Sequence, residues 1–174
     1  MPGFLRFPAG LLLAVAATVG AGAMRLPASP DFFLFAVAAV SRCGRPVPAM
    51  FAGLAAGLFE DSLVSAPRLL GLHAFTKVVL GYLLAELASR ASVESPPAAG
   101  AILGAAVLVE SGLVALLLWF LQGELGLAEP VPLLLRVTAT AVVGALLVVA
   151  ARVPWKARMA SRRRRRPPKA RDDL

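Results

Sequence analysis

Residues 57–84 read GLFEDSLVSAPRLLGLHAFTKVVLGYLL, and they place charged side chains inside one of the most apolar parts of the chain. Glu60 and Asp61 are adjacent, and the only histidine, His73, lies four residues before Lys77. Residues four apart share one face of a helix. An enzyme could use such a group for acid–base chemistry, whereas a membrane protein could use it for topology and packing. The rest of the chain must decide between these two uses.

The composition is that of an integral membrane protein. Hydrophobic residues make up 59% of the 174 residues and charged residues 16%, whereas soluble domains are about half apolar and about a quarter charged. The mean hydropathy is +0.78, and the length suits one domain. The net charge of +8 does not indicate a nucleic-acid partner, because ten of the eighteen Lys and Arg residues lie from Arg152 onward. The single cysteine, Cys43, excludes an internal disulfide.

The spacing of the charges predicts an all-α membrane protein with six transmembrane helices in residues 1–154. A helix needs about 20 apolar residues to cross the bilayer, and the apolar intervals are 7–24, 32–41, 46–59, 69–84, 97–121 and 131–151. A cleavable signal peptide is the alternative for the first interval. The second interval is too short to cross as a straight helix unless Asp31 and the residues before it contribute. A re-entrant hairpin is less favourable, because it would hold Arg42 and Arg45 in hydrocarbon.

The basic residues predict that both termini are cytoplasmic, since cytoplasmic loops carry an excess of Lys and Arg. Residues 155–174 are predicted to be a disordered polybasic tail, because like charges repel and Pro167 and Pro168 disfavour a helix. The tail has two interpretations, an orientation signal alone or a patch for anionic lipid headgroups. The predicted lipid contacts are Arg162, Arg163, Arg164, Arg165 and Arg166.

The buried charges are predicted to include an ion pair between Lys77 and Glu110. Helix rise places Lys77 about 12 Å below the outer surface and Glu110 about 10 Å below it, so the depths agree. Arg136 is the competing partner. The pair can fix helix register or contribute to a transport pathway, and snorkelling without a pair is the third alternative. Glu60 and Asp61 are expected to end the third span at the outer surface.

Helix packing and catalysis can also be judged from spacing. Gly53 and Gly57 are four residues apart, which favours close contact between membrane helices.

Glu60 and Asp61 point about 100° apart on a helix and are poorly placed to share a proton. The sequence has no Ser-His-Asp spacing, no His/Cys ligand set and no phosphate loop. We therefore predict no enzyme activity, no catalytic residue, no cofactor and no metal site.

Residues 26–90 contain a series of short motifs that follow the predicted helices. Pro30-Asp31 opens a short second helix, a basic turn follows, and a glycine-rich third helix ends in Gly-Leu-Phe-Glu-Asp at 57–61. Leu-Gly-Leu-His-Ala-Phe at 70–75 and Leu-Gly-Tyr-Leu at 80–83 complete the pattern. This pattern resembles the rod shape-determining protein MreD family, although the long polybasic tail departs from many relatives. The candidate motif or contact residues are Asp31, Gly57, Asp61, Gly71, His73, Ala74, Gly81 and Tyr82.

The resemblance implies a non-enzymatic subunit of the cell-elongation complex in the bacterial cytoplasmic (inner) membrane. Such proteins bind MreC and connect MreB filaments to a transpeptidase and to RodA, and so regulate peptidoglycan synthesis and cell shape. Their fold is expected to resemble the substrate-binding (S-component) subunits of ECF vitamin transporters. The MreC contact is expected near the second to fourth spans, and a homodimer is an open alternative. The alternative function is a vitamin-binding transport subunit, which would need a polar-lined pocket.

Overall fold

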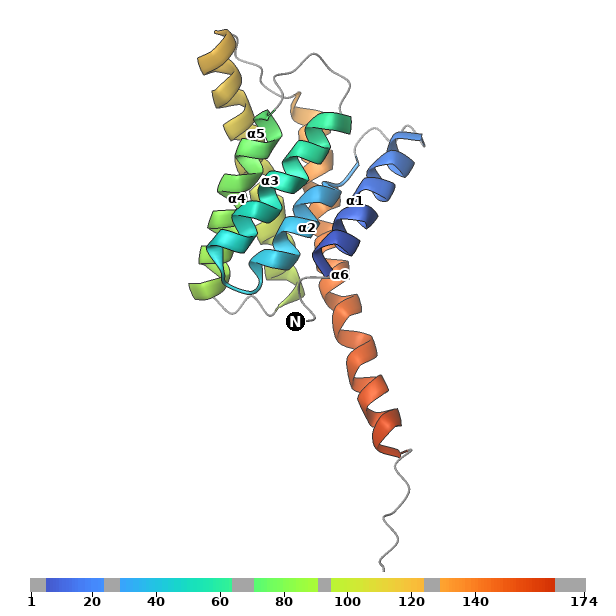
Figure 1. Ribbon diagram of the computed structural model, residues 1–174. Coiled ribbons are helices and arrows are strands. Elements are labelled where there is room, and N and C mark those ends of the chain that lie inside the picture. The colour runs from blue at the N-terminus through green and yellow to red at the C-terminus, as the bar shows by residue number, and fades with distance from the viewer. Residues whose placement is uncertain (1–5, 24–28, 64–70, 91–94, 124–128, 165–174) are drawn as a thin grey trace, which may run out of the picture.

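The computed structural model describes residues 6–23, 29–63, 71–90, 95–123 and 129–164, and these form a bundle of helices without strands. Successive helices run in opposite directions, so α1 begins and α6 ends at the same end of the bundle (Figure 1). The six described helices are α1 (Arg6–Ala23), α2 (Phe32–Ser41), α3 (Pro46–Leu63), α4 (Leu72–Arg90), α5 (Pro96–Gln122) and α6 (Pro130–Arg164).

Three described helices are long and apolar enough to cross a membrane, namely α4, α5 and the Pro130–Ala150 part of α6. By this measure the chain is a membrane protein. Helix α2 has only 10 residues, so it rises about 15 Å against a hydrocarbon core of about 30 Å. Irregular backbone at that depth is tolerated where protein buries it. Asp31, which directly precedes α2, meets this condition, because it is buried and its N–H donates a hydrogen bond to the Thr140 hydroxyl.

Helices α3 and α4 are an antiparallel pair in direct backbone contact. A Cβ atom at Gly53 would clash with the carbonyl of Lys77, and one at Gly57 would clash with the backbone of Ala74. Gly81 makes the reciprocal contact, because a Cβ there would clash with the carbonyl of Ala49. The small residues of both helices therefore allow the backbones to approach, as is common where membrane helices associate.

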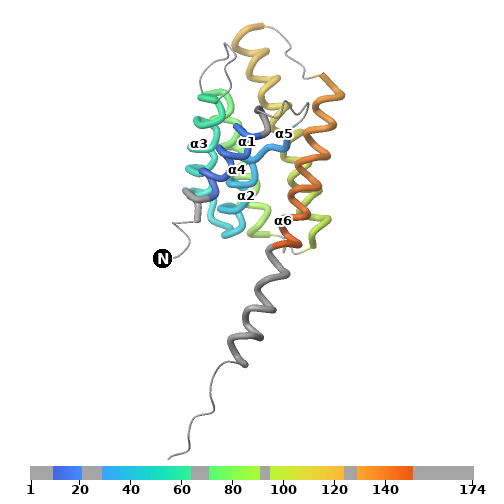
Figure 2. The backbone as a smooth tube through the Cα atoms, turned by 90° about the vertical axis from the view of Figure 1, so that its right-hand side faces the viewer, coloured from blue at the N-terminus to red at the C-terminus, as the bar shows by residue number. Residues whose placement is uncertain are grey.

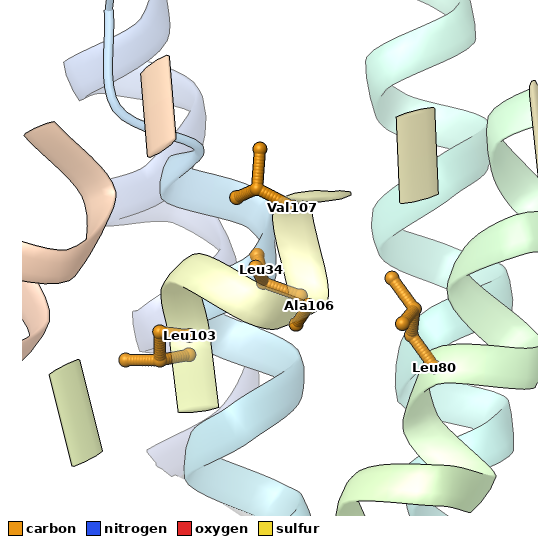
Figure 3. Packing of buried hydrophobic residues seen from close by; sticks show 5 residues of the cluster. All are labelled: Leu34, Leu80, Leu103, Ala106 and Val107. Atoms are coloured by element: carbon orange, nitrogen blue, oxygen red, sulfur yellow. The ribbon is translucent and has the colours of Figure 1, made fainter. Parts of the chain in front are cut away.

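Helices α5 and α6 form the second pair, and α2 lies between the two pairs (Figure 2). The backbone of α5 contacts α6 at Gly100, where a Cβ would lie 2.7 Å from the Ala141 carbonyl oxygen. Leu34 of α2 packs in the shared apolar core, and α1 packs on the outer side of α2 through Ala14. The buried side chains of the shared core, shown in Figure 3, are Leu34, Leu80, Leu103, Ala106 and Val107.

Two helices extend beyond their predicted ends. Helix α3 continues to Leu63, so Glu60 and Asp61 lie within it rather than in a surface loop. Helix α6 continues to Arg164, which corrects the predicted disorder for residues 155–164. Ala, Met, Lys and Arg are good helix formers, and the next strong helix breakers are Pro167 and Pro168. Residues 165–174 lie outside the described part of the chain.

The backbone contact between α3 and α4 predicts that Gly57→Ala destabilises the protein by about 1–3 kcal/mol, because the added methyl group has no space. Gly112→Ala is the matched control, since a Cβ at Gly112 meets nothing within 4 Å. The measurement is thermal unfolding of the purified protein in one detergent. Equal unfolding temperatures for the two variants would contradict the described packing.

Candidate functional site

Asp31 connects the start of α2 to two other helices. Its side chain is buried, and Oδ1 accepts a hydrogen bond of 2.9 Å from the Leu34 N–H, which caps α2. Aspartate is favoured at this position because the first N–H groups of a helix have no partner within it. The other oxygen, Oδ2, accepts hydrogen bonds from Lys77 Nζ at 2.8 Å and from Arg136 Nη2 at 2.9 Å. One carboxylate therefore links α2, α4 and α6.

Lys77 of α4 is completely buried, with 0% of its surface exposed. Its Nζ atom lies 2.6 Å from Glu110 Oε1 of α5 and 2.9 Å from Glu60 Oε2 of α3, in addition to its contact with Asp31. An ammonium group has three protons to donate, and three carboxylates surround this one. A buried charge is tolerated only when it is paired, so this lysine requires α3, α5 and the start of α2 to be in place.

Arg136 of α6 brings a second cation to the same carboxylates. Its Nη2 atom lies 2.9 Å from Asp31 Oδ2 and 3.4 Å from Glu60 Oε1. About 32% of its side chain is exposed, compared with 11% for Glu60 and 0% for Lys77. The ionised groups are therefore most accessible from the side of Arg136.

His73 lies one helical turn before Lys77 and faces the same group. Its Nδ1 atom is 3.5 Å from Glu110 Oε1 and 4.0 Å from Glu60 Oε1. Together these side chains form what we call the charge cluster, which consists of Asp31, Glu60, His73, Lys77, Glu110 and Arg136.

Asp61 has a different task from its neighbour Glu60. Its carboxylate accepts hydrogen bonds from the backbone N–H groups of Gly71 at 2.9 Å, His73 at 3.2 Å and Ala74 at 3.4 Å. These donors belong to the start of α4, where a negative charge is also favoured by the helix dipole. Gly71 has φ +100°, a backbone conformation that residues other than glycine rarely adopt. Asp61 therefore caps α4 from the end of α3 and sets the position of His73.

The other motif candidates divide between the interior and the lipid-facing surface. Gly57, Ala74 and Gly81 are buried in the contact between α3 and α4. Tyr82 is 46% exposed and points away from that contact. Three of the eight predicted motif or contact residues thus pack the helix pair, and Tyr82 is the one of the eight that is exposed.

The structure brings Lys77 and Glu110 together as the sequence predicts, and it changes the roles of three other residues. Arg136 does not compete for Glu110, because its described partners are Asp31 and Glu60. Glu60 was expected at the outer surface, but it is only 8% exposed. The reason is that α3 continues to Leu63, which places Glu60 a turn inside the helix. Asp31, predicted to open the second helix, is also buried, since it caps α2 within the bundle.

Three members of the cluster could in principle ligate a metal ion, because atoms of Glu60, His73 and Glu110 lie within 4.8 Å of one another. A metal would need carboxylate lone pairs that already face the Lys77 ammonium at 2.6 and 2.9 Å. It would also repel that ammonium, since no water separates charges at such distances. The donor set therefore suits a lysine better than a metal ion.

The predicted lipid contacts fall at the edge of the described chain. Arg162, Arg163 and Arg164 belong to the last turn of α6, whereas Arg165 and Arg166 lie outside the described residues. Contact of this segment with anionic lipid stays a prediction.

Searches of protein-family models, of curated proteins and of solved structures gave no match to this chain. The likeness to the MreD family and to vitamin-transporter subunits therefore stays a prediction from the motifs.

Removing the lysine should cost far more than removing an exposed cation. Lys77→Met leaves Glu110 without a permanently charged partner and leaves Asp31 and Glu60 with Arg136, and breaking a buried ion pair from one side costs about 3–5 kcal/mol. Arg90→Met is the control, because Arg90 pairs with Glu86 on the exposed surface of α4, where such pairs contribute about 0–1 kcal/mol. Denaturant or thermal unfolding in detergent measures both variants. The double variant Lys77→Met/Glu110→Gln should recover part of the loss, and no recovery would argue against the Lys77–Glu110 pair.

Proposed function

We propose that this chain is a non-enzymatic membrane subunit of the bacterial cell-elongation complex, with the role that the MreD resemblance implies. It would bind MreC and, directly or through MreC, connect MreB filaments to the transpeptidase and RodA in the cytoplasmic membrane. Loss of the protein would then affect cell shape rather than a chemical reaction or the uptake of a solute.

The observation that carries the proposal is the position of the motif residues. Asp31 and His73 belong to the charge cluster, and Asp61 caps the helix that contributes Lys77. Gly57 and Gly81 permit the backbone contact between α3 and α4. The residues that resemble the family therefore stabilise one arrangement of the helices. A scaffold requires such a fixed arrangement.

The distribution of basic residues supports the proposed topology of six spans with both termini inside. The turn between α2 and α3 carries Arg42 and Arg45, and α4 ends at Arg90. These ends lie at the same side of the bundle as the start of α1 and the end of α6 (Figure 1). An excess of Lys and Arg on one side is typical of the cytoplasmic face.

A cavity between α2, α4, α5 and α6 bears on the alternative function. Its volume is about 190 Å³ and its lining is mostly apolar, with Ser41 and Arg42 at the α2 side. Small-molecule sites usually have about 300–1,000 Å³ and a few convergent polar groups. The cavity also lies toward the opposite end of these helices from the charge cluster. These features favour a scaffold over a vitamin-binding subunit.

One face of α3 is a suitable contact for the single membrane helix of MreC. It is exposed on the side away from α4, and its spacing of three and four residues is that of a helix–helix seam. Its apolar residues are Val47, Phe51, Leu54 and Leu58, which are 62%, 67%, 40% and 41% exposed.

The proposal implies a rod-shaped bacterial host, and depletion of the protein there should make the cells round while vitamin uptake stays normal. The measurement is cell width by microscopy together with uptake of labelled vitamins. Unchanged width with a loss of uptake would overturn the proposal in favour of the transport subunit.

The same cells allow the partner to be tested. A photo-crosslinking residue in place of Phe51 on α3 should capture MreC, whereas the matched position Leu146, 60% exposed on α6, should not. Equal capture at both positions, or none at Phe51, would contradict the proposed contact face.

A further inference from the structure

The charge cluster has one negative charge more than its permanent cations balance. The carboxylates of Asp31, Glu60 and Glu110 face Lys77 and Arg136. If all five groups are ionised and His73 is neutral, the formal sum is −1. A net charge inside a low-dielectric bundle is costly, because it is neither hydrated nor paired. The environment of the cluster therefore favours one further positive charge.

The position of His73 shows where that charge can be held. Its Nδ1 atom faces Glu110 Oε1 at 3.5 Å and Glu60 Oε1 at 4.0 Å. Ionised carboxylates only accept hydrogen bonds, so the nitrogen that faces them must carry a proton. Among the described residues, His73 Nδ1, Glu60 Oε2 and Glu110 Oε2 are buried and have no hydrogen-bond partner. The cluster thus contains a buried, unpartnered ring nitrogen together with two carboxylates that each keep an unpartnered oxygen.

We propose that His73 is a proton-binding site and that its imidazolium is the third cation of the charge cluster. The elements packed against it contribute the charges of this balance: Asp31 before α2, Glu60 on α3, Lys77 on its own helix, Glu110 on α5 and Arg136 on α6. The nearby Asp61 carboxylate is outside this balance, because it accepts hydrogen bonds from the backbone N–H groups at the start of α4. With the proton bound, three negative charges meet three positive charges. This inference is independent of the proposed scaffold function, because it rests only on the geometry and charge of the cluster.

A divalent metal ion is a poorer occupant than a proton. It would change the formal sum from −1 to +1 and would lie close to Lys77, whose ammonium is 2.6 Å from Glu110 Oε1. A proton restores neutrality without displacing any contact. The cluster is also open to exchange, since the side chain of Arg136 is 32% exposed and leads to Glu60 and Asp31.

The proposal links proton binding to helix packing. His73 lies on α4, and its two carboxylate neighbours lie on α3 and α5. The protonated form attracts both helices, so its stabilisation is present at lower pH and is lost when rising pH removes the proton. The bundle should therefore become less stable at alkaline pH, in a step that His73→Gln lacks.

The chain has a single histidine, so nitrogen NMR of ¹⁵N-histidine-labelled protein reports on His73 alone, provided that the purification tag contains no histidine. The protein is studied in lipid nanodiscs at about pH 8. An exposed histidine, with a pKa of about 6.5, is about thirtyfold more often neutral than charged there. The proposal predicts that both ring nitrogens of His73 are protonated. A neutral ring at this pH would overturn it.

Two further NMR experiments identify the cause of the positive charge on His73. Glu110→Gln removes one negative charge from the cluster, so His73 should become neutral at the same pH, whereas Glu86→Gln on the surface of α4 should leave it charged. Added Zn²⁺ should leave the wild-type spectrum unchanged. A zinc-dependent shift of the ring nitrogens would replace the proton site with a metal site and would contradict the proposal.

Discussion

The rest of the structure depends on the burial of the Lys77 ammonium group. A fully buried lysine is stable only if carboxylates replace the water that it loses, and here Asp31, Glu60 and Glu110 do so from three other segments. The Glu60 carboxylate can reach it because Gly53 lets α3 lie against the backbone of α4 at Lys77 itself. The close contact of the helices and the ion pairing are therefore two parts of one arrangement.

This constraint also explains the short second helix. A ten-residue helix cannot cross the hydrocarbon core alone, yet its N-terminal cap, Asp31, bonds Lys77 and Arg136 deep in the bundle. Asp31, directly before α2, is buried within the bundle. Buried ion pairs often contribute little net stability compared with apolar residues, but in some proteins they specify one register. We interpret the cluster as the feature that selects one arrangement of these helices.

The sequence was sufficient to predict the helices and one contact of the charge cluster, the pair of Lys77 and Glu110. Apolar intervals located all six described helices, and helix rise brought Lys77 to the depth of Glu110. The contribution of Glu60 and Asp31 to the charge cluster was not predicted, because charged residues next to turns usually face water. Both are buried here, since α3 ends and α2 begins within the bundle. The two signals that could have indicated them were a Pro-Asp cap before a short helix and the unbalanced charge of the interior. The end of α6 was missed because repulsion between arginines was weighted above their helix propensity.

The central claim is that the charge on Asp31, and not its capping role alone, holds α2, α4 and α6 together. Asp31→Asn separates the two, because asparagine also caps helices well but cannot form the ion pairs with Lys77 and Arg136. Hydrogen–deuterium exchange of the two proteins in detergent is the most direct measurement. Faster exchange in α4 around Lys77 and in α6 around Arg136, with α2 still capped, is the predicted result. Exchange that changes only next to residue 31 would contradict the account.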